Sequence, residues 1–279
     1  MDQANIRKPM AAGRFYPSES QALSEMIKNI LYHEKNKIAL DNVVKTIYGA
    51  VVPHAGYMFS AYQAVHFFEL IARMEKKVDT FIIINPNHNG YGEKISMDSH
   101  KYWGTPFGNI EQDEEFIAEL GFPFSNIAHE HEHAGEVMLP LLLYFVKYNF
   151  KIVMITLSQQ NNENAKEIAK RIKETEQKLN RNIIIIASSD FTHFKDAETG
   201  RKLDDMVLKQ IMEHNADRVY QVVRENNISV CGYGPIMSLM EYAALSGTYS
   251  TNILARGHSG QIMPSDKVVD YITILFMKQ

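Results

Sequence analysis

Histidine and carboxylate side chains follow three separate apolar segments of the sequence, each at the point where the segment ends. His54 follows one segment, His88 follows the next, and Asp190 and His193 follow a third. In parallel α/β sheets, ligands bind in the crevice outside the carboxyl ends of the strands. If the three segments are strands of one parallel sheet, these imidazole and carboxylate groups meet at one edge and form a single site.

The single cysteine, Cys231, lies close to two glycines and just before an apolar segment with helical character. A thiol at the entrance of a helix is stabilised as the thiolate by the positive end of the helix dipole. We therefore expect an accessible thiolate here rather than a small buried side chain. Imidazole and thiolate ligands together suit zinc, iron or copper, whereas carboxylate and water ligands suit magnesium or calcium.

The segment 129–133 alternates histidine and glutamate and matches both H-E-x-x-H and its inverse, H-x-x-E-H. A zinc hydrolase built on His129 and His133 is one interpretation, with a glutamate as base for a metal-bound water. Because any alternating run fits both patterns, we expect most of the segment to be the solvated, acidic start of a helix. His133 and Glu136 then share a helix face. Among the other histidines, only His258 lies in a loop that could close over a pocket.

The elements that position these residues alternate between strands and helices. Four short apolar segments, rich in β-branched residues, are nearly continuous in hydrophobicity, which is typical of strands buried on both faces of a largely parallel sheet. Two further strands at the C-terminus are expected to form an antiparallel pair. The sequence thus predicts an α/β fold with a largely parallel, mixed central sheet and helices on both faces. The predicted strands are 47–52, 81–84, 152–157, 183–186, 249–255 and 267–276; the predicted helices are 18–31 (opened by a capping-box pattern), 62–74, 163–179 and 236–245.

Composition narrows the class of protein. The chain has 279 residues, 45% hydrophobic and 22% charged, and a net charge of −4, values typical of a globular protein with a large core. The acidic balance disfavours nucleic-acid binding, and one cysteine excludes an internal disulfide. No apolar segment reaches the roughly 20 residues of a membrane span, and the N-terminus lacks a signal-peptide pattern. We expect one cytoplasmic domain over residues 1–279, with no membrane partner.

Six short motifs together resemble the Memo family, which includes the bacterial and archaeal proteins called AmmeMemoRadiSam system protein B. The resemblance runs from about residue 8 to the C-terminus. This family is similar in fold to the class III extradiol dioxygenases, which implies a single domain of that kind with a metal pocket at the strand ends. The motifs are Ala12-Gly-x-Phe-Tyr-Pro17, Pro53-His-Ala-Gly-Tyr57, Asn85-Pro-Asn-His88, Glu132-His-x-x-Glu136 with Leu139-Pro140, Ser188-Ser-Asp-Phe-Thr-His193 and Cys231-Gly232.

The resemblance implies a metal site and neighbouring catalytic groups. His54, His88 and Cys231 match the family's metal-binding positions, which implies a site for iron or copper. Asp190 and His193 match polar residues that line the same pocket. In these roles His193 would act as the acid or base, and Asp190 would orient an imidazole.

Five more residues are candidates for the wall of this pocket. Phe15 matches an aromatic residue at the pocket mouth, where family members are described as holding a phosphotyrosine-type peptide. Tyr57, His133 and Glu136 belong to the matching motifs. Phe59 stands where a tyrosine is common in the family, so a hydroxyl near the pocket is missing.

Two functions from different classes follow from these residues. The first is a mononuclear non-haem metal redox enzyme of unknown substrate, with Fe(II) as the expected ion and copper or zinc as alternatives. A thiolate ligand changes the redox potential, so dioxygenase activity does not follow from the fold. The second is a binding protein with a vestigial metal pocket that holds phosphotyrosine, an acidic peptide or a small anion. The resemblance also implies radical-SAM and AMMECR-type proteins as partners in a shared pathway.

Overall fold

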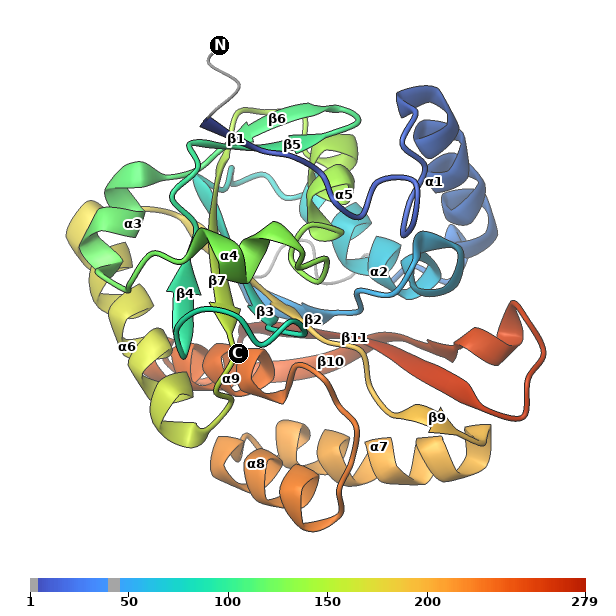
Figure 1. The fold of residues 1–279 in the computed structure, drawn as a ribbon. Helices are drawn as coiled ribbons and strands as arrows, with labels where there is room; N and C mark the ends of the chain where they lie inside the picture. The colour runs from blue at the N-terminus through green and yellow to red at the C-terminus, as the bar shows by residue number, and fades with distance from the viewer. Residues whose placement is uncertain (1–4, 40–45) are drawn as a thin grey trace.

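The central sheet contains eight strands within residues 5–39 and 46–279, the part of the chain that the computed structural model describes (Figure 1). They are β2 (Ile47–Val52), β3 (Thr80–Pro86), β4 (Ile95–Met97), β7 (Lys151–Leu157), β8 (Ile183–Ser188), β9 (His193–Lys195), β10 (Tyr249–His258) and β11 (Val268–Lys278). Their order is β10-β11-β2-β8-β3-β7-β4, and β9 pairs with β11. β2, β8, β3 and β7 run parallel, whereas β4, β9 and β10 pair antiparallel with their neighbours. The predicted mixed sheet is confirmed.

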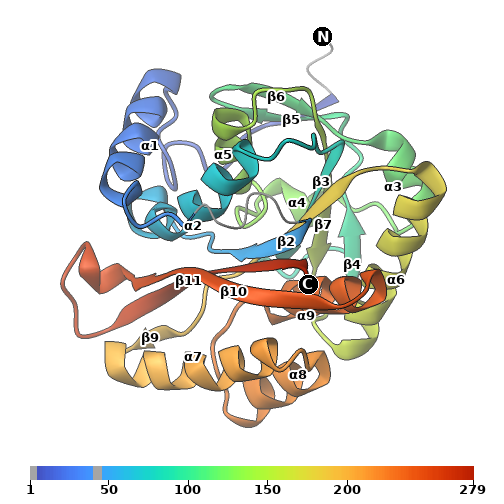
Figure 2. The ribbon, with the colours of Figure 1, turned by 180° about the vertical axis from the view of Figure 1, so that it is seen from behind.

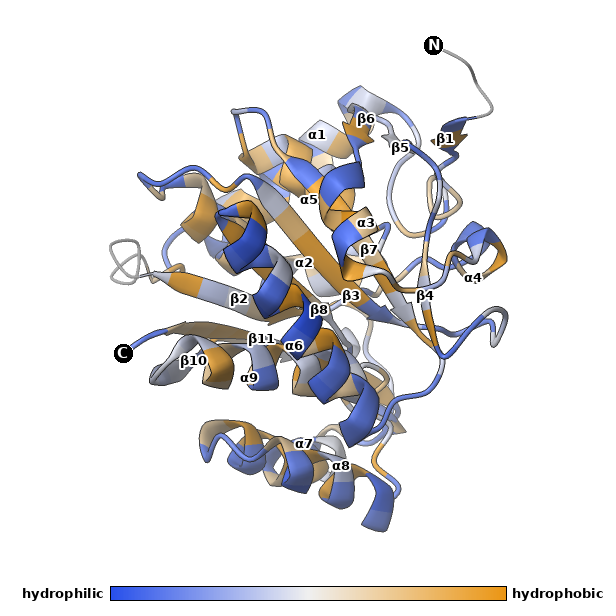
Figure 3. Cartoon of the chain, turned by 90° about the vertical axis from the view of Figure 1, so that its left-hand side faces the viewer, coloured by the Kyte–Doolittle hydropathy of each residue, from blue (hydrophilic) through white to orange (hydrophobic). Residues whose placement is uncertain are grey.

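The strands in the middle of the sheet are buried along their whole length. Every residue of β2, β3 and β8 is buried, and only the first residue of β7 is partly exposed. Figure 3 shows these strands as a largely hydrophobic layer inside the molecule. Because helices cover both faces, a run without alternation is the pattern that such strands require. The C-terminal strands form the expected antiparallel pair, β10 with β11.

Helices cover both faces of the sheet and form a separate hydrophobic core on each (Figures 1 and 2). One face carries α1 (Ser20–Glu34), α2 (Tyr57–Ala72) and α5 (Met138–Phe145). The other carries α6 (Asn162–Leu179), α7 (Ala197–Met212), α8 (Ala216–Glu225) and α9 (Tyr233–Ser246). The short helix α3 (Glu114–Leu120) contacts α6, and the short helix α4 (Asn126–Glu130) contacts β4. A 3₁₀ turn (Ser259–Gln261) lies between β10 and β11. This is a single-domain α/β fold.

Some boundaries differ from the sequence predictions. α2 begins at Tyr57, five residues before the predicted start, because its first turn is already buried against the core. The capping box predicted at Ser18 is wrong: the N-cap of α1 is Glu19, and it makes no side-chain cap bond. The sequence also gave no sign of a small second sheet, formed by β1 (Ile6–Arg7), β5 (Tyr102–Thr105) and β6 (Gly108–Glu111).

The strand order explains how distant motifs come together. β8 lies between β2 and β3 and runs parallel to both, so the residues that follow these three strands emerge side by side. The long strand β11 pairs with β9 through its first residues and with β2 through its last residues. β9 begins at His193. Among the described residues, no helix has the length and apolar character needed to cross a membrane.

Candidate metal centre

His54 follows β2, is buried, and has its ring orientation fixed by hydrogen bonds. Its backbone N–H donates to Asp190 Oδ1 at 2.8 Å, and its ring Nδ1 lies 2.8 Å from Ser188 Oγ. The Ser188 hydroxyl donates its only hydrogen to the Ala134 carbonyl at 2.7 Å, so it accepts a hydrogen from Nδ1 of His54. Nε2 is therefore the ring nitrogen without a hydrogen, the one that can bind a metal ion.

His88 follows β3 and is held by the buried carboxylate of Glu132. The His88 backbone N–H donates to Glu132 Oε2 at 2.6 Å, and ring Nδ1 donates to Glu132 Oε1 at 2.9 Å. Burial works against the charged form of His88, but the carboxylate outweighs it and raises the pKa of His88. Because Nδ1 carries the hydrogen, Nε2 is again the nitrogen left for a ligand.

His133 completes a group of three imidazoles. Its ring stacks between Phe15, at a centroid distance of 4.2 Å, and His88, at 4.9 Å. One nitrogen from each of His54, His88 and His133 lies within 4.8 Å of the others, the single group of this kind among the described residues. Glu132 also faces this ring, with 3.5 Å between its Oε1 and His133 Nδ1. The expectation that His133 belongs to the pocket fits this arrangement.

Burial keeps two of the three imidazoles neutral. It lowers the pKa of His54 well below its usual value, and the neighbouring histidines add to the effect. Burial also lowers the pKa of His133 to about 4, against the opposing pull of Glu132. Neutral imidazole nitrogens bind metal ions without first losing a proton.

Cys231 lies at the same site, in contact with His54. Its Sγ is 3.2 Å from His54 Nε2 and accepts a hydrogen bond from the Asp190 backbone N–H, also at 3.2 Å. The predicted stabilisation of the thiolate by the helix entrance is wrong. The side chain is only partly exposed, and burial and the Asp190 carboxylate raise the pKa of its thiol. The helix entrance is close, since α9 begins at Tyr233, but it does not outweigh these two effects. A bound metal ion would displace the proton.

Asp190 and His193 lie beyond the end of β8. Asp190 is buried, and burial raises its pKa to about 6. His193 is partly exposed and its Nδ1 donates to the Ser229 carbonyl at 2.8 Å, which leaves Nε2 free. A positive charge on His193 would lower the pKa of both Asp190 and His54, so the three groups lie close enough to influence one another.

Three predicted wall residues lie elsewhere or have other partners. Tyr57 is buried and donates to the Val137 carbonyl at 2.6 Å. Glu136 is fully buried and accepts hydrogen bonds from Tyr16 Oη and from two backbone N–H groups of the N-terminal segment, and it pairs with Arg7. Phe59 lines a different cavity. Of the five, Phe15 and His133 are the ones that border the group of imidazoles.

The predicted helix start at 129–133 is wrong, and the segment is only partly solvated, through Glu130 and His131. α4 ends at Glu130, and both His129 and Glu132 are buried. The ring nitrogens of His129 lie 3.1 Å from the Ser96 carbonyl and 3.2 Å from Thr156 Oγ1, away from the group of imidazoles. A zinc site built on His129 and His133 therefore does not form.

Sequence reasoning missed the groups that orient the histidines. Glu132 was visible only as one letter of the alternating run, and Ser188 only as part of a motif, yet they fix the rings of His88 and His54. A hollow of about 420 Å³ opens above the imidazoles, and its rim includes Arg14 and Asn89.

Comparisons with known proteins agree with the motifs. The family model described as Memo-like protein matches residues 7–275. A MEMO1 family protein of Methanocaldococcus jannaschii is 37% identical over 270 residues, covering 92% of this chain and 93% of the relative. Another, from Methanococcoides burtonii, is 33% identical over 273 residues, covering 97% and 99%.

One solved structure shares the fold. It is an uncharacterized protein of Escherichia coli K12, with a TM-score of 0.50 at 9% identity, over 76% of this chain and 91% of that one. At this identity the likeness concerns the fold alone. The family match and the archaeal relatives, in contrast, span nearly the whole chain, and so the chain belongs to the Memo family.

Proposed function

We propose that this protein is a redox enzyme with one non-haem metal ion, iron in the first place and copper as the alternative. The same donors also suit zinc, which has no redox chemistry. The observation that carries the proposal is the convergence of three imidazoles within 4.8 Å, with a cysteine sulfur 3.2 Å from one of them. Imidazole and thiolate donors favour these metals over magnesium and calcium.

The residues present fit such an ion. His54 and His88 have Nδ1–H groups committed to Ser188 and Glu132, so both offer Nε2. The third donor is either Cys231, as the resemblance implies, or His133, which belongs to the group of three imidazoles. Carboxylate-supported and hydroxyl-supported imidazoles are typical of metal ligands whose orientation is fixed in advance.

A bound iron ion would supply one-electron chemistry and an open position for O₂ or substrate. The side chains of the protein transfer the proton, position the ligands and limit access of water. His193 Nε2 is free to accept or return a proton, while Ser229 holds the ring. Asp190 fixes the loop that carries His54 by accepting its backbone N–H. Phe15 covers the ring of His133 and shields it from water.

Metal content of protein purified without oxygen tests the proposal. We expect about one iron per chain in the wild type, and loss of iron in His54→Ala. Cys231→Ala and His133→Ala identify the third ligand. Substitution of the residue that binds the metal should lower the iron content more than substitution of the other. His33→Ala is the matched control, because His33 is exposed and lies outside both the group of imidazoles and the hollow above it. Wild-type protein that holds no transition metal after anaerobic reconstitution would contradict the proposal.

The reaction is a separate question. We propose an O₂-dependent reaction of the extradiol-dioxygenase kind as the first to screen, supported by the imidazole donors that converge beyond β2 and β3 and by the free Nε2 of His193. Oxygen uptake by iron-loaded protein with catechols should exceed that of His193→Ala, which keeps the candidate ligands but loses the acid–base group. Equal oxygen uptake by the wild type and His193→Ala would contradict the proposal that the protein cleaves catechol rings.

A second candidate function is the binding of an anionic aromatic ligand without catalysis. The specific observation is Arg14, an exposed cation on the rim of the hollow beside the Phe15 ring. Calorimetry with phosphotyrosine distinguishes the two functions. Binding that survives chelation and is lost in Arg14→Ala supports the binding protein, whereas binding that requires the metal supports the enzyme.

A further inference from the structure

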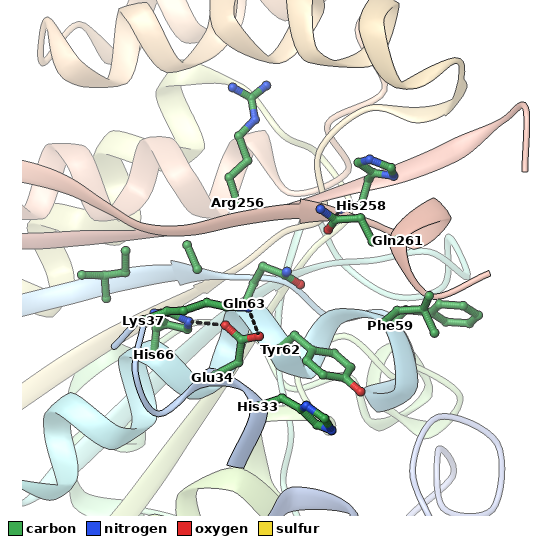
Figure 4. A pocket seen from close by; sticks show the side chains of 13 residues that line it. His33, Glu34, Lys37, Phe59, Tyr62, Gln63, His66, Arg256, His258 and Gln261 are labelled. Carbon is green, nitrogen blue, oxygen red and sulfur yellow. Dashed lines mark hydrogen bonds and ion pairs between the residues drawn. The ribbon is translucent and has the colours of Figure 1, made fainter. Parts of the chain in front are cut away.

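A second cavity of about 540 Å³ lies between α1, α2 and β10, and Figure 4 shows the side chains that line it. Phe59, Tyr62, Gln63 and His66 project into it from one face of α2, because they are spaced at three and four residues. Opposite them lies the end of β10, with His258. None of the candidate metal ligands belongs to its lining.

The charged groups around the cavity neutralise one another. Glu34 is buried and lies between Lys37 Nζ, at 2.8 Å, and His66 Nε2, at 3.1 Å. The guanidinium of Arg256 points away from the cavity in Figure 4 and is bound by Asp205 at 2.5 Å. The charged side chains of the described lining, Glu34, Lys37 and Arg256, are all paired, so this lining favours an uncharged ligand.

Two buried hydrogen-bond acceptors on this face of α2 have no partner among the described residues. They are the carboxamide oxygen of Gln63 and Nδ1 of His66, whose side chains are 9% and 4% exposed. The Glu34 carboxylate can only accept, so Nε2 of His66 carries a hydrogen; in the tautomer with its one hydrogen on Nε2, Nδ1 is an acceptor. A buried acceptor without a donor costs about 1–3 kcal/mol. A molecule that supplies O–H or N–H groups would satisfy both atoms.

The rest of the lining combines amides with flat apolar rings. Gly257 leaves room for two carboxamides, since a side chain there would collide with Gln63 Nε2 and Gln261 Oε1. The rings of Phe59 and Tyr62 form the wall beside them in Figure 4. Paired amides and imidazoles that both donate and accept, next to an aromatic surface, match a molecule with many hydroxyl groups and an apolar C–H face.

We propose that this cavity binds a small uncharged polyol, such as a monosaccharide or a cyclitol. Small rotations of the two side chains bring Gln63 Oε1 and His66 Nδ1 to the cavity surface, where the hydroxyl groups form hydrogen bonds with them. Other hydroxyl groups accept from the Gln63 amide, while the C–H face packs on Tyr62 and Phe59. The site is distinct from the proposed metal centre, so binding does not require the metal ligands.

Calorimetry with D-glucose and myo-inositol tests this proposal. We expect the wild type to bind at least one of them with a Kd of roughly 1 mM or tighter. Gln63→Leu should weaken that binding about tenfold, the equivalent of one hydrogen bond. Gly257→Ala should weaken it as well, because its methyl group displaces the Gln63 amide. His54→Ala should bind the polyol like the wild type.

The thermal midpoint of Gln63→Leu shows whether a loss of binding reflects a loss of folding. Leucine has a similar volume and removes an unpartnered polar group, so the thermal midpoint should be unchanged or higher. Gln221→Leu, at an exposed position of α8, is the matched control and should bind normally. The proposal is overturned if the wild type binds neither polyol, if Gln63→Leu binds both as the wild type does, or if putrescine or phosphate binds here and the polyols do not. Ordered water on the two acceptors, in a crystal grown with a polyol, would overturn it too.

Discussion

The proposed metal centre and the region around β10 and β11 differ in how completely their buried polar groups are paired. At the metal centre, Ser188 and Glu132 satisfy the Nδ1–H groups of His54 and His88. Among the described residues, several buried side-chain atoms without a hydrogen-bond partner lie beside β10 and β11, on Gln63, His66, His258 and Asp270, and others lie on Asp98, Trp103 and Gln112.

This difference separates two kinds of polar interior. Where every hydrogen has a partner, ring orientation is set before any ligand arrives, which suits a metal site that must hold its geometry. Where acceptors lack donors, the fold carries a cost that a ligand or a proton can relieve. The predictions below test whether the paired region is rigid and whether the unpaired region is destabilising.

Glu136→Ala should have the largest effect on stability. Glu136 is fully buried and pairs with Arg7, and it also accepts from Tyr16 Oη at 2.6 Å. Removal leaves the buried guanidinium of Arg7 without its carboxylate, so we expect a loss of about 3–5 kcal/mol in the free energy of unfolding. Urea titration measures it, with Glu130→Ala at an exposed position as control. A loss below about 1 kcal/mol would mean that this paired cluster is not a stabilising one.

Glu132→Gln should reduce metal affinity without unfolding the protein. Glutamine keeps the shape of the side chain but loses the charge that holds both His88 hydrogen bonds, at 2.6 and 2.9 Å. Loss of a partner of this kind typically costs 10–100-fold in metal affinity. Competition with a chelator measures the effect, and Glu130→Gln is the control. Unchanged affinity would show that His88 does not depend on Glu132 for its orientation, or that it is not a ligand.

The sequence predicted the parts of this site that depend on strand ends. Buried parallel strands appear as continuous apolar runs, so the positions of His54, His88 and Asp190 at one edge followed from the runs before them. Cys231 was placed near the site only by resemblance, because no sequence pattern brings a loop before α9 to the end of β8.

The rest could not be predicted because it depends on long-range contacts. Glu132 looks solvated in an alternating His/Glu run, and it is buried only because the loop after α4 turns inward onto His88. The acidity of Cys231 likewise depends on burial and on Asp190, forty-one positions away in the chain. Phe59 was expected at the metal pocket, yet the rotation of α2 turns it to the second cavity.

Stability should depend on pH through Asp270, on the unpaired side of the comparison. Burial first, and the nearby Asp204 carboxylate second, raise the pKa of Asp270 to about 7, although Arg256 opposes them. The folded protein therefore binds this proton more tightly than the unfolded chain, whose aspartates have pKa values of about 3.9. Its contribution to the free energy of unfolding must fall as pH rises from about 4 to 7. Asp270→Asn should remove this fall, as urea titrations at pH 5 and pH 8 would show; the same fall in both proteins would argue that Asp270 titrates normally.

The smallest effect should come from Gln63→Leu, and its sign is informative when it is set beside Ser188→Ala. Ser188→Ala leaves the buried Nδ1–H of His54 and the Ala134 carbonyl without partners, so we expect a loss of about 1–3 kcal/mol. Gln63→Leu removes an acceptor that has no donor to lose, so the free energy of unfolding should stay within about 1 kcal/mol of the wild type, on the stabilising side. Parallel urea titrations measure both. If the two substitutions destabilise the protein equally, then Gln63 Oε1 has a hydrogen-bond partner in solution, such as an ordered water. The buried polar groups of the two regions would then be equally well paired.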